Sequence, residues 1–195
     1  MKRHQISHTT EYNRYPNIFQ ICAEYFKKKS IKILSFGCSD GTEVFSLKDL
    51  YFPTSEIHGV DISKDIIEVC KSKNNDSSIK FSHTNEIYKS QKAYNLIFCM
   101  SVFCRWPQTS EINDCSSKYP FKMFQDQLID VDKHLLPKGL LVIYNANFCF
   151  SELDIYPQFT PLTDKRINES GFVHKFNSKN QKIDFNYKDC IFIKK

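Results

Sequence analysis

Apolar residues along this chain follow two alternating patterns, one typical of buried strands and one typical of amphipathic helices. Short apolar runs predict strands, and the longest run, 94–103, is what a strand covered on both faces requires. Between the runs, apolar residues recur at helical spacing, first at Ile18, Ile21 and Cys22. The expected strands cover residues 31–36, 56–60, 79–82, 94–103, 140–146, 172–176 and 190–193. Strands that alternate with helices over short connections indicate an α/β fold with an open, mainly parallel sheet.

Residues at the ends of the helical segments set their expected boundaries. Pro16 suits the first turn of a helix, and Ser63 is a good N-cap for the helix after the second strand. Apolar residues from Phe121 to Leu135 predict a later helix that stops at Pro137. These boundaries leave helices on both faces of the sheet.

Two segments after the carboxyl ends of strands are candidates for substrate contacts. Residues 104–120 contain two prolines and many polar groups, so we expect a loop there. Residues 148–162 mix prolines with aromatic residues and form either a lid or a surface crossover. We expect a substrate to enter over the first segment and under the second.

The clearest local signal is the change from strand to helix within residues 31–47. The apolar strand stops at Gly37, and a second glycine, Gly41, precedes a segment with helical spacing. Such a turn directs backbone N–H groups and the positive end of a helix toward one point, which suits a nucleotide or an anionic group. Asp61 ends the next strand, where a dinucleotide-type βαβ unit places its ribose-binding carboxylate.

The composition indicates one domain over residues 1–195 that can bury a core, since 41% of the chain is hydrophobic. A net charge of +5 does not by itself indicate an acidic partner. The eight cysteines show no C-x-x-C spacing and mostly lie in apolar segments, so we expect reduced thiols in a cytoplasmic protein. No apolar run approaches the roughly 20 residues that span a bilayer, so we expect neither membrane insertion nor secretion.

The glycine turn, Asp61 and the long strand 94–103 together resemble class I S-adenosylmethionine-dependent methyltransferases, and the resemblance covers most of the chain. It implies a Rossmann-like, doubly wound sheet of seven strands, with S-adenosylmethionine as the cofactor and no metal. The glycine-rich loop would pass under the methionine part of the cofactor, and Asp61 would bind the ribose hydroxyls. The positions that the resemblance assigns to the cofactor are Gly37, Cys38, Ser39, Gly41 and Asp61, with Ile62 flanking the adenine.

Three further positions match the family more weakly. Asn85 follows the third strand, where the family commonly has an acid that contacts the adenine. Met100 and Ser101 end the fourth strand, beside the expected sulfonium. Each of the three is otherwise an ordinary loop or core residue.

Ser35 stands where the family often has an acidic residue. In this departure the chain resembles the chemotaxis receptor methyltransferases. The stretch 33–47 reads Ile-x-Ser-x-Gly-Cys-Ser-x-Gly-x-Glu-x-x-Ser-Leu, as in that branch, which makes Glu43 a candidate for the cofactor's amino group. Those enzymes also carry a helical domain and an inserted small sheet, for which this chain has no room. The resemblance therefore favours cofactor binding over a receptor glutamate substrate.

The segment before the first helix resembles the N-terminal element of the same branch, which closes over the cofactor and meets its carboxylate. Thr10 and Arg14 match that element, whereas His8 stands where an asparagine is usual. A guanidinium can bind a carboxylate through two hydrogen bonds, although Arg14 could equally be a surface arginine before a helix. We therefore expect a cofactor-closing element and helix at 1–29 and a Rossmann-like core at 30–195.

No residue is assigned a catalytic role, because the bound cofactor is already activated and the protein mainly supplies alignment and exclusion of water. Residues near the expected mouth are His8, His83, Arg105, Trp106, Tyr144 and Asn147. The Asn/Asp-Pro-Pro-aromatic motif of amino-group nucleic-acid methyltransferases is absent at 100–103. We therefore expect a small molecule or a protein side chain as the acceptor, rather than a nucleic acid.

Three other functions compete with this interpretation. Residues 37–41 also fit the Gly-x-Ser-x-Gly elbow of α/β-hydrolases, with Ser39 as nucleophile and Asp154 and His174 in the required order, but only one strand precedes Ser39. A nicotinamide site would prefer glycines at Ser39 and Thr42. A degenerate methyltransferase fold could serve as a non-catalytic binding module, although the retained glycines and Asp61 argue against this.

Overall fold

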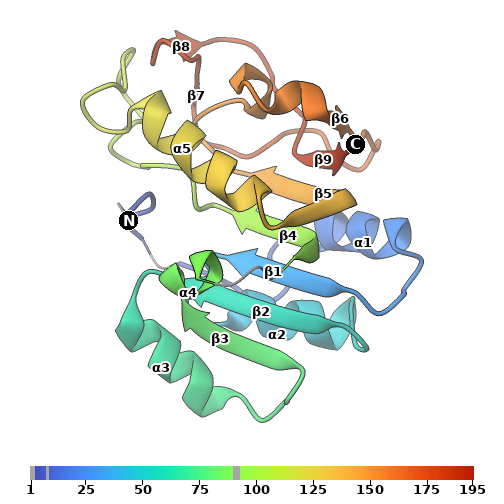
Figure 1. The fold of residues 1–195 in the computed structure, drawn as a ribbon. Helices are drawn as coiled ribbons and strands as arrows, with labels where there is room; N and C mark the ends of the chain where they lie inside the picture. Colours follow the sequence, from blue (N-terminus) through green and yellow to red (C-terminus); the bar gives the residue numbers. More distant parts are fainter. Residues whose placement is uncertain (1–2, 8, 90–92) are drawn as a thin grey trace.

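The computed structural model describes residues 3–7, 9–89 and 93–195 of the chain. Its main sheet has seven strands in the order β3, β2, β1, β4, β5, β9, β6 (Figure 1). The first five strands in the chain are parallel, and β9 is antiparallel to both of its neighbours. The strands are β1 (Lys32–Phe36), β2 (Glu56–Asp61), β3 (Ile79–His83), β4 (Tyr94–Met100), β5 (Leu135–Tyr144), β6 (Phe159–Pro161) and β9 (Ile191–Lys194).

Helices cover both faces of this sheet. Neighbouring residues of β4 point to opposite faces, so that Ile97 and Phe98 belong to different core clusters. The Phe98 face packs against α1 (Pro16–Tyr25), α2 (Thr42–Leu50) and α3 (Lys64–Lys73). The Ile97 face packs against α4 (Asn85–Tyr88) and α5 (Phe121–Asp132). The prediction of a doubly wound α/β fold with a mainly parallel, seven-stranded sheet is confirmed.

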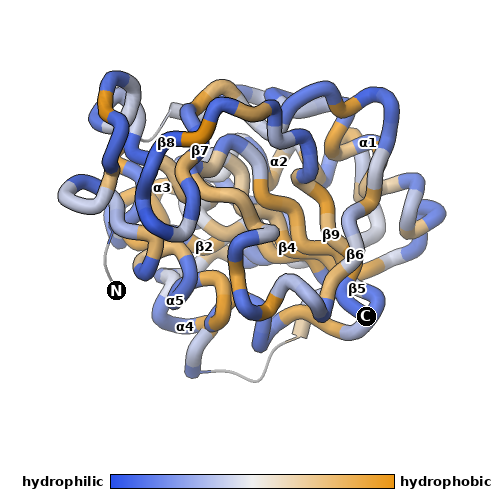
Figure 2. The backbone as a smooth tube through the Cα atoms, turned by 90° about the horizontal axis from the view of Figure 1, so that it is seen from above, coloured by the Kyte–Doolittle hydropathy of each residue, from blue (hydrophilic) through white to orange (hydrophobic). Residues whose placement is uncertain are grey.

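Local signals placed several helix ends correctly. Pro16 occupies the first turn of α1. Ser63 caps α3, because its side-chain oxygen accepts a hydrogen bond from the Ile66 N–H at 3.5 Å. Apolar residues gather along the strands, and hydrophilic residues dominate the surrounding loops (Figure 2). No helix in the described ranges is long and apolar enough to cross a membrane.

The boundary between α5 and β5 differs from the expected one. The helix ends at Asp132, and the strand already begins at Leu135, upstream of Pro137. Leu135 pairs with Tyr94 of β4, and the register shifts before Leu96. The prediction that the helix continues to Pro137 was wrong, because a strand irregularity can accommodate the proline that a regular central strand would reject.

The C-terminal part of the chain corrects two further predictions. Residues 172–176 do not join the main sheet, because β7 (Lys175–Phe176) pairs with β8 (Lys182–Ile183) in a separate two-stranded sheet. The segment 148–162 contributes β6 instead, together with the 3₁₀ helices η1 (Phe150–Glu152) and η2 (Tyr156–Gln158). Phe148, Phe150 and Phe159 in this segment are buried in the core, so it is a packed crossover and not a lid.

Candidate functional site

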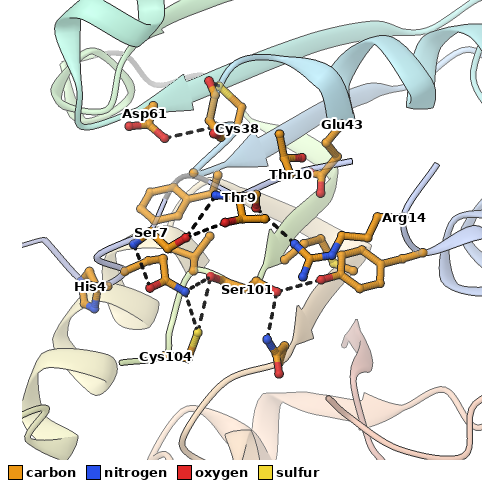
Figure 3. Close-up of a pocket in the computed structure, with 18 of the residues that line it drawn as sticks. His4, Ser7, Thr9, Thr10, Arg14, Cys38, Glu43, Asp61, Ser101 and Cys104 are labelled. Atoms are coloured by element: carbon orange, nitrogen blue, oxygen red, sulfur yellow. Dashed lines mark hydrogen bonds between the residues drawn. The ribbon is translucent and has the colours of Figure 1, made fainter. Parts of the chain in front are cut away.

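A pocket of about 210 Å³ opens at the carboxyl ends of the parallel strands (Figure 3). Gly37 follows β1, Asp61 ends β2, Met100 ends β4 and Asn145 follows β5, and all four line the pocket. Open parallel sheets leave their binding crevice at this edge, where the order of the strands reverses. The pocket therefore lies where the glycine turn predicted a ligand.

The loop between β1 and α2 folds tightly around one side of this pocket. Gly37 and Gly41 have φ angles of +80° and +85°, and Ser39 between them also has a positive φ of +50°. The N–H groups of Gly37 and Cys38 both donate to the carbonyl oxygen of Val60, at 2.8 and 2.9 Å. Glycine is favoured at positive φ, which explains both glycines of the turn.

Asp61 connects this loop to the start of α3. Its Oδ2 accepts a hydrogen bond from the Ser39 N–H at 3.1 Å, and its Oδ1 accepts one from the Ser63 N–H at 2.9 Å. The side chain is buried but lines the pocket. The sequence predicted the position of this carboxylate, but not its contact with the loop.

Glu43 projects from the first turn of α2 into the same pocket. The hydroxyl of Ser35 donates to its Oε1 at 2.8 Å. Burial raises the pKa of Glu43 to about 7, against the smaller opposing effects of the Ser35 hydrogen bond and the charge of Arg14. A cationic ligand group beside this carboxyl group would stabilise its ionised form.

Glu43→Gln is expected to stabilise the empty protein at about pH 8 by on the order of 1–3 kcal/mol. Because the folded-state pKa of Glu43 is raised from 4.5 to about 7, its contribution to stability is complete below about pH 4.5 and is lost as the pH rises through 7. Glutamine stays neutral, and its amide oxygen can still accept from Ser35. Thermal unfolding of both proteins measures the difference, which should grow between about pH 5 and about pH 8. A difference in stability that stays constant over this pH range would contradict a raised pKa for Glu43.

The residues before α1 cover the pocket as an N-terminal strap, which we define as residues 3–7 and 9–15. Gln5 Nε2 donates to the carbonyl oxygen of Ser101 at 3.1 Å, and the Tyr15 hydroxyl hydrogen-bonds the Ser101 Oγ at 2.8 Å. His4 Nδ1 hydrogen-bonds the buried Tyr119 hydroxyl at 2.7 Å. The strap is thus attached to Ser101 and to Tyr119, and His8 lies outside the described residues.

Arg14 of the strap faces the pocket from the side where Glu43 lies (Figure 3). Its Nη1 donates to the carbonyl oxygen of Thr9 at 3.2 Å, and its guanidinium lies over the Tyr15 ring, 5.2 Å from the centroid. A cation and a carboxyl group therefore approach the same part of the pocket.

Ten of the residues that the resemblance assigned to the cofactor line this pocket. They are Thr10, Arg14, Gly37, Cys38, Ser39, Glu43, Asp61, Ile62, Met100 and Ser101. Gly41 lies behind the loop, and Asn85 is exposed at the start of α4, while its neighbour Thr84 lines the pocket instead. One-residue errors at element ends are expected from sequence alone.

Sequence reasoning missed several lining residues. Asn145 follows β5 and could have been found from the rule that strand ends carry the site. Phe172 and four residues of the strap reach the pocket only through contacts that are remote in sequence, for which no local signal exists; the four are Arg3, His4, Gln5 and Ser7.

Of the candidates near the mouth, Trp106 lines the pocket, whereas His83, Arg105, Tyr144 and Asn147 do not. Asn147 is structural, because its Oδ1 accepts from the Arg105 N–H at 2.8 Å and its Nδ2 donates to the His174 carbonyl oxygen at 2.9 Å. Within the described ranges, no group of three or more histidine, cysteine, aspartate and glutamate residues could hold a metal ion.

The hydrolase alternative lacks its catalytic partners in this structure. Asp154 is exposed and accepts a hydrogen bond from Gln125 at 3.2 Å, and His174 is also exposed. Neither residue lines the pocket that contains Ser39. A nucleophilic serine needs its base within hydrogen-bonding reach, so this arrangement does not form the triad.

Comparisons with known proteins agree with this geometry. Residues 34–119 match the family model described as a methyltransferase domain. Malonyl-[acyl-carrier protein] O-methyltransferase 1 of Ilyobacter polytropus is 42% identical over 79 residues, which cover 39% of this chain and 29% of that protein. Malonyl-[acyl-carrier protein] O-methyltransferase of Bacillus cereus is 26% identical over 184 residues, which cover 87% of this chain and 61% of that protein. The chain thus spans less than two thirds of the length of both relatives.

Among solved structures, the plantazolicin methyltransferase BpumL in complex with SAH is similar at 18% identity and a TM-score of 0.47, over 66% of this chain and 45% of that one. The matched residues 34–119 include the turn after β1, Asp61 and the end of β4. This half of the sheet holds most of the pocket-lining residues outside the N-terminal strap. Residues 34–119, from within β1 to the loop before α5, thus match a methyltransferase domain.

Proposed function

We propose that this chain binds S-adenosylmethionine and transfers its methyl group to a small molecule or a protein side chain. The observation that supports this most is the distribution of charge in the pocket. Arg14 and Glu43 lie at one end, and Asp61 lies at the other (Figure 3). The cofactor has a zwitterionic amino acid at one end and a ribose diol next to its adenine, so the three side chains are complementary to it.

S-adenosylmethionine supplies an activated methyl group when it is bound, and the protein's part is to align the acceptor and exclude water. The N-terminal strap covers the pocket and is fixed to the end of β4 through Ser101. We infer that it closes over the cofactor, as the corresponding element of the chemotaxis receptor methyltransferases does. The proposed division into this element and helix at 1–29 and a core at 30–195 follows from that role.

Arg14→Ala should lower the affinity for S-adenosylhomocysteine by about 10-fold or more, because a charge-assisted hydrogen bond to the cofactor carboxylate contributes on the order of 1.5–3 kcal/mol. The melting temperature of the empty protein should change little, since the hydrogen bond from Arg14 to the Thr9 carbonyl oxygen is exposed to solvent. Arg14→Lys keeps the charge but not the planar guanidinium, so its affinity should lie between those of the wild type and Arg14→Ala. A large loss of stability without ligand would make Arg14 structural.

The acceptor is expected to enter beside Trp106 and Phe172, and not under residues 148–162. The two rings meet edge to face with centroids 5.8 Å apart, and 49% of Trp106 and 60% of Phe172 remain exposed although both line the pocket. Exposed aromatic side chains at the mouth of a pocket can hold a compact organic group.

The test is a methyl-transfer screen with labelled S-adenosylmethionine against metabolite pools, protein extract and RNA. The two relatives are named for malonyl-[acyl-carrier protein], so a carboxyl group on a carrier protein belongs in the panel. We expect label in a small molecule or a protein, and loss of that label in Trp106→Ala without loss of cofactor binding. Label in RNA alone would overturn the acceptor class, and cofactor binding with no transfer would favour the non-catalytic binding module.

The cysteines bear on where this reaction takes place. All eight are buried free thiols in the structure. Buried free thiols in this number favour a reducing compartment, and we propose a cytoplasmic location.

A further inference from the structure

Two of the buried cysteines meet at the loop that lines the pocket. Cys38 follows Gly37 in this loop and lines the pocket, and Cys70 lies in α3 with no exposed surface. Both sulfur atoms are directed at the same acceptor, the carbonyl oxygen of Ser39, with Sγ to oxygen distances of 3.7 Å for Cys38 and 3.2 Å for Cys70. The two thiols are therefore neighbours although they are far apart in the sequence.

Because both Sγ atoms lie near one carbonyl oxygen, each thiol also affects the titration of the other. The Cys38 thiol lowers the pKa of Cys70, while burial raises the pKa of Cys38. Cys38 lines the pocket and keeps 2% of its surface exposed, whereas Cys70 has none, so an oxidant in the pocket would meet Cys38 first. Cys70 lies directly behind it, as a second thiol that could react with an oxidised Cys38.

We propose that Cys38 and Cys70 are an oxidisable dithiol that a peroxide converts to a disulfide, and that this disulfide closes the pocket to its ligand. The Cys38 sulfur first attacks one peroxide oxygen, which breaks the O–O bond, gives a sulfenic acid and releases one water. The Cys70 sulfur then displaces the second water and forms the S–S bond. One peroxide is reduced to two waters, and the two thiols lose two electrons and two protons in total.

The loop around Cys38 is the reason why this bond should affect the pocket. The Cys38 N–H donates to Val60 at 2.9 Å, and its carbonyl oxygen accepts from the Gly41 N–H at 3.1 Å. The Ser39 N–H donates to Asp61, so the conformation of the loop and the position of the carboxylate are coupled. A disulfide has fixed length and dihedral preferences, so linking Cys38 to α3 would move a loop whose turns are already tightly specified.

The test uses the full chain, with hydrogen peroxide as the oxidant. Peptide mapping by mass spectrometry should show a Cys38 to Cys70 crosslink that dithiothreitol removes. Calorimetry with S-adenosylhomocysteine should show at least 10-fold weaker binding after oxidation and recovery after reduction. Saturating S-adenosylhomocysteine should slow crosslinking, because the ligand would cover Cys38.

Cys70→Ser should bind S-adenosylhomocysteine like the reduced wild type and keep this affinity in peroxide, with Cys70→Ala as a second variant if the serine protein does not fold. Cys115→Ser, which removes another buried thiol outside the pocket lining, should respond to peroxide as the wild type does. Absence of the crosslink, or a crosslink that leaves affinity unchanged, overturns the inference. If the reduced chain binds no S-adenosylhomocysteine, the proposed function fails, while the peptide map still decides the thiol chemistry.

Discussion

Asp61→Ala is expected to weaken S-adenosylhomocysteine binding by about 5- to 150-fold, because on the order of 1–3 kcal/mol is lost when hydrogen-bonding partners are left unpaired. The expected contribution has two parts. The carboxylate would contact the ribose, and it also holds the loop after β1 through the Ser39 N–H and the start of α3 through the Ser63 N–H. Both backbone groups would lose their side-chain acceptor in the alanine variant.

These loop contacts also give Asp61 a role in the stability of the empty protein. The structure predicts an accompanying loss of stability of about 1–2 kcal/mol, since two hydrogen bonds from backbone N–H groups end on this side chain. Asp61→Asn is the matched control, because its amide oxygen can still accept one of them. Calorimetry below the melting temperature of each variant separates the two effects. Unchanged affinity in a folded Asp61→Ala protein would show that the ribose does not lie there.

Gly37→Ala is expected to abolish measurable cofactor binding and to lower the melting temperature. The φ of Gly37 is +80°, a region that L side chains rarely adopt, and a Cβ atom there would lie 2.5 Å from Cγ2 of Val102. Val102 itself lines the pocket, so relief of the clash would change the shape of the site. We expect a destabilisation of about 1–3 kcal/mol from strain and overpacking.

Gly41→Ala provides the comparison for this effect. Its φ of +85° imposes similar strain, but the added Cβ would meet Phe81 at 3.0 Å, in the core behind the loop. Gly41 does not line the pocket. Both variants should lose stability, measured by thermal unfolding. For a similar loss of stability, Gly37→Ala should lose far more affinity for the cofactor than Gly41→Ala does. Equal losses of affinity would mean that strain anywhere in the loop weakens binding. Close approach of the cofactor to Gly37 would then not be the cause.

The parts of the fold that were predicted correctly depend on short-range signals. The turn from β1 to α2 could be identified because glycines stand where φ is positive, and the start of α3 because Ser63 caps it. Asp61 could be placed because the carboxyl end of a parallel strand next to that turn is a fixed point of the topology. The rule that ligands bind at the carboxyl ends of parallel strands thus identified most of the pocket-lining residues that follow β1, β2 and β4.

The errors arose where contacts between remote segments override local preference. Pro137 signalled a helix end, but pairing of β5 with β4 draws this residue into a strand. Residues 148–162 have the composition of a lid, yet their aromatic side chains fill the core beside β9. Phe172 lines the pocket from a segment that was expected to be a strand, and nothing local distinguishes it from the other phenylalanines.

Calorimetric titration of the reduced full chain with S-adenosylhomocysteine tests the central claim most directly. The account predicts saturable binding of one ligand per chain, together with an affinity that falls as the pH drops below about 7, where Glu43 in the empty pocket takes up a proton. The contradicting result is a titration of folded protein with millimolar ligand that releases or absorbs no more heat than dilution of the ligand does. In that case the pocket would not be the cofactor site.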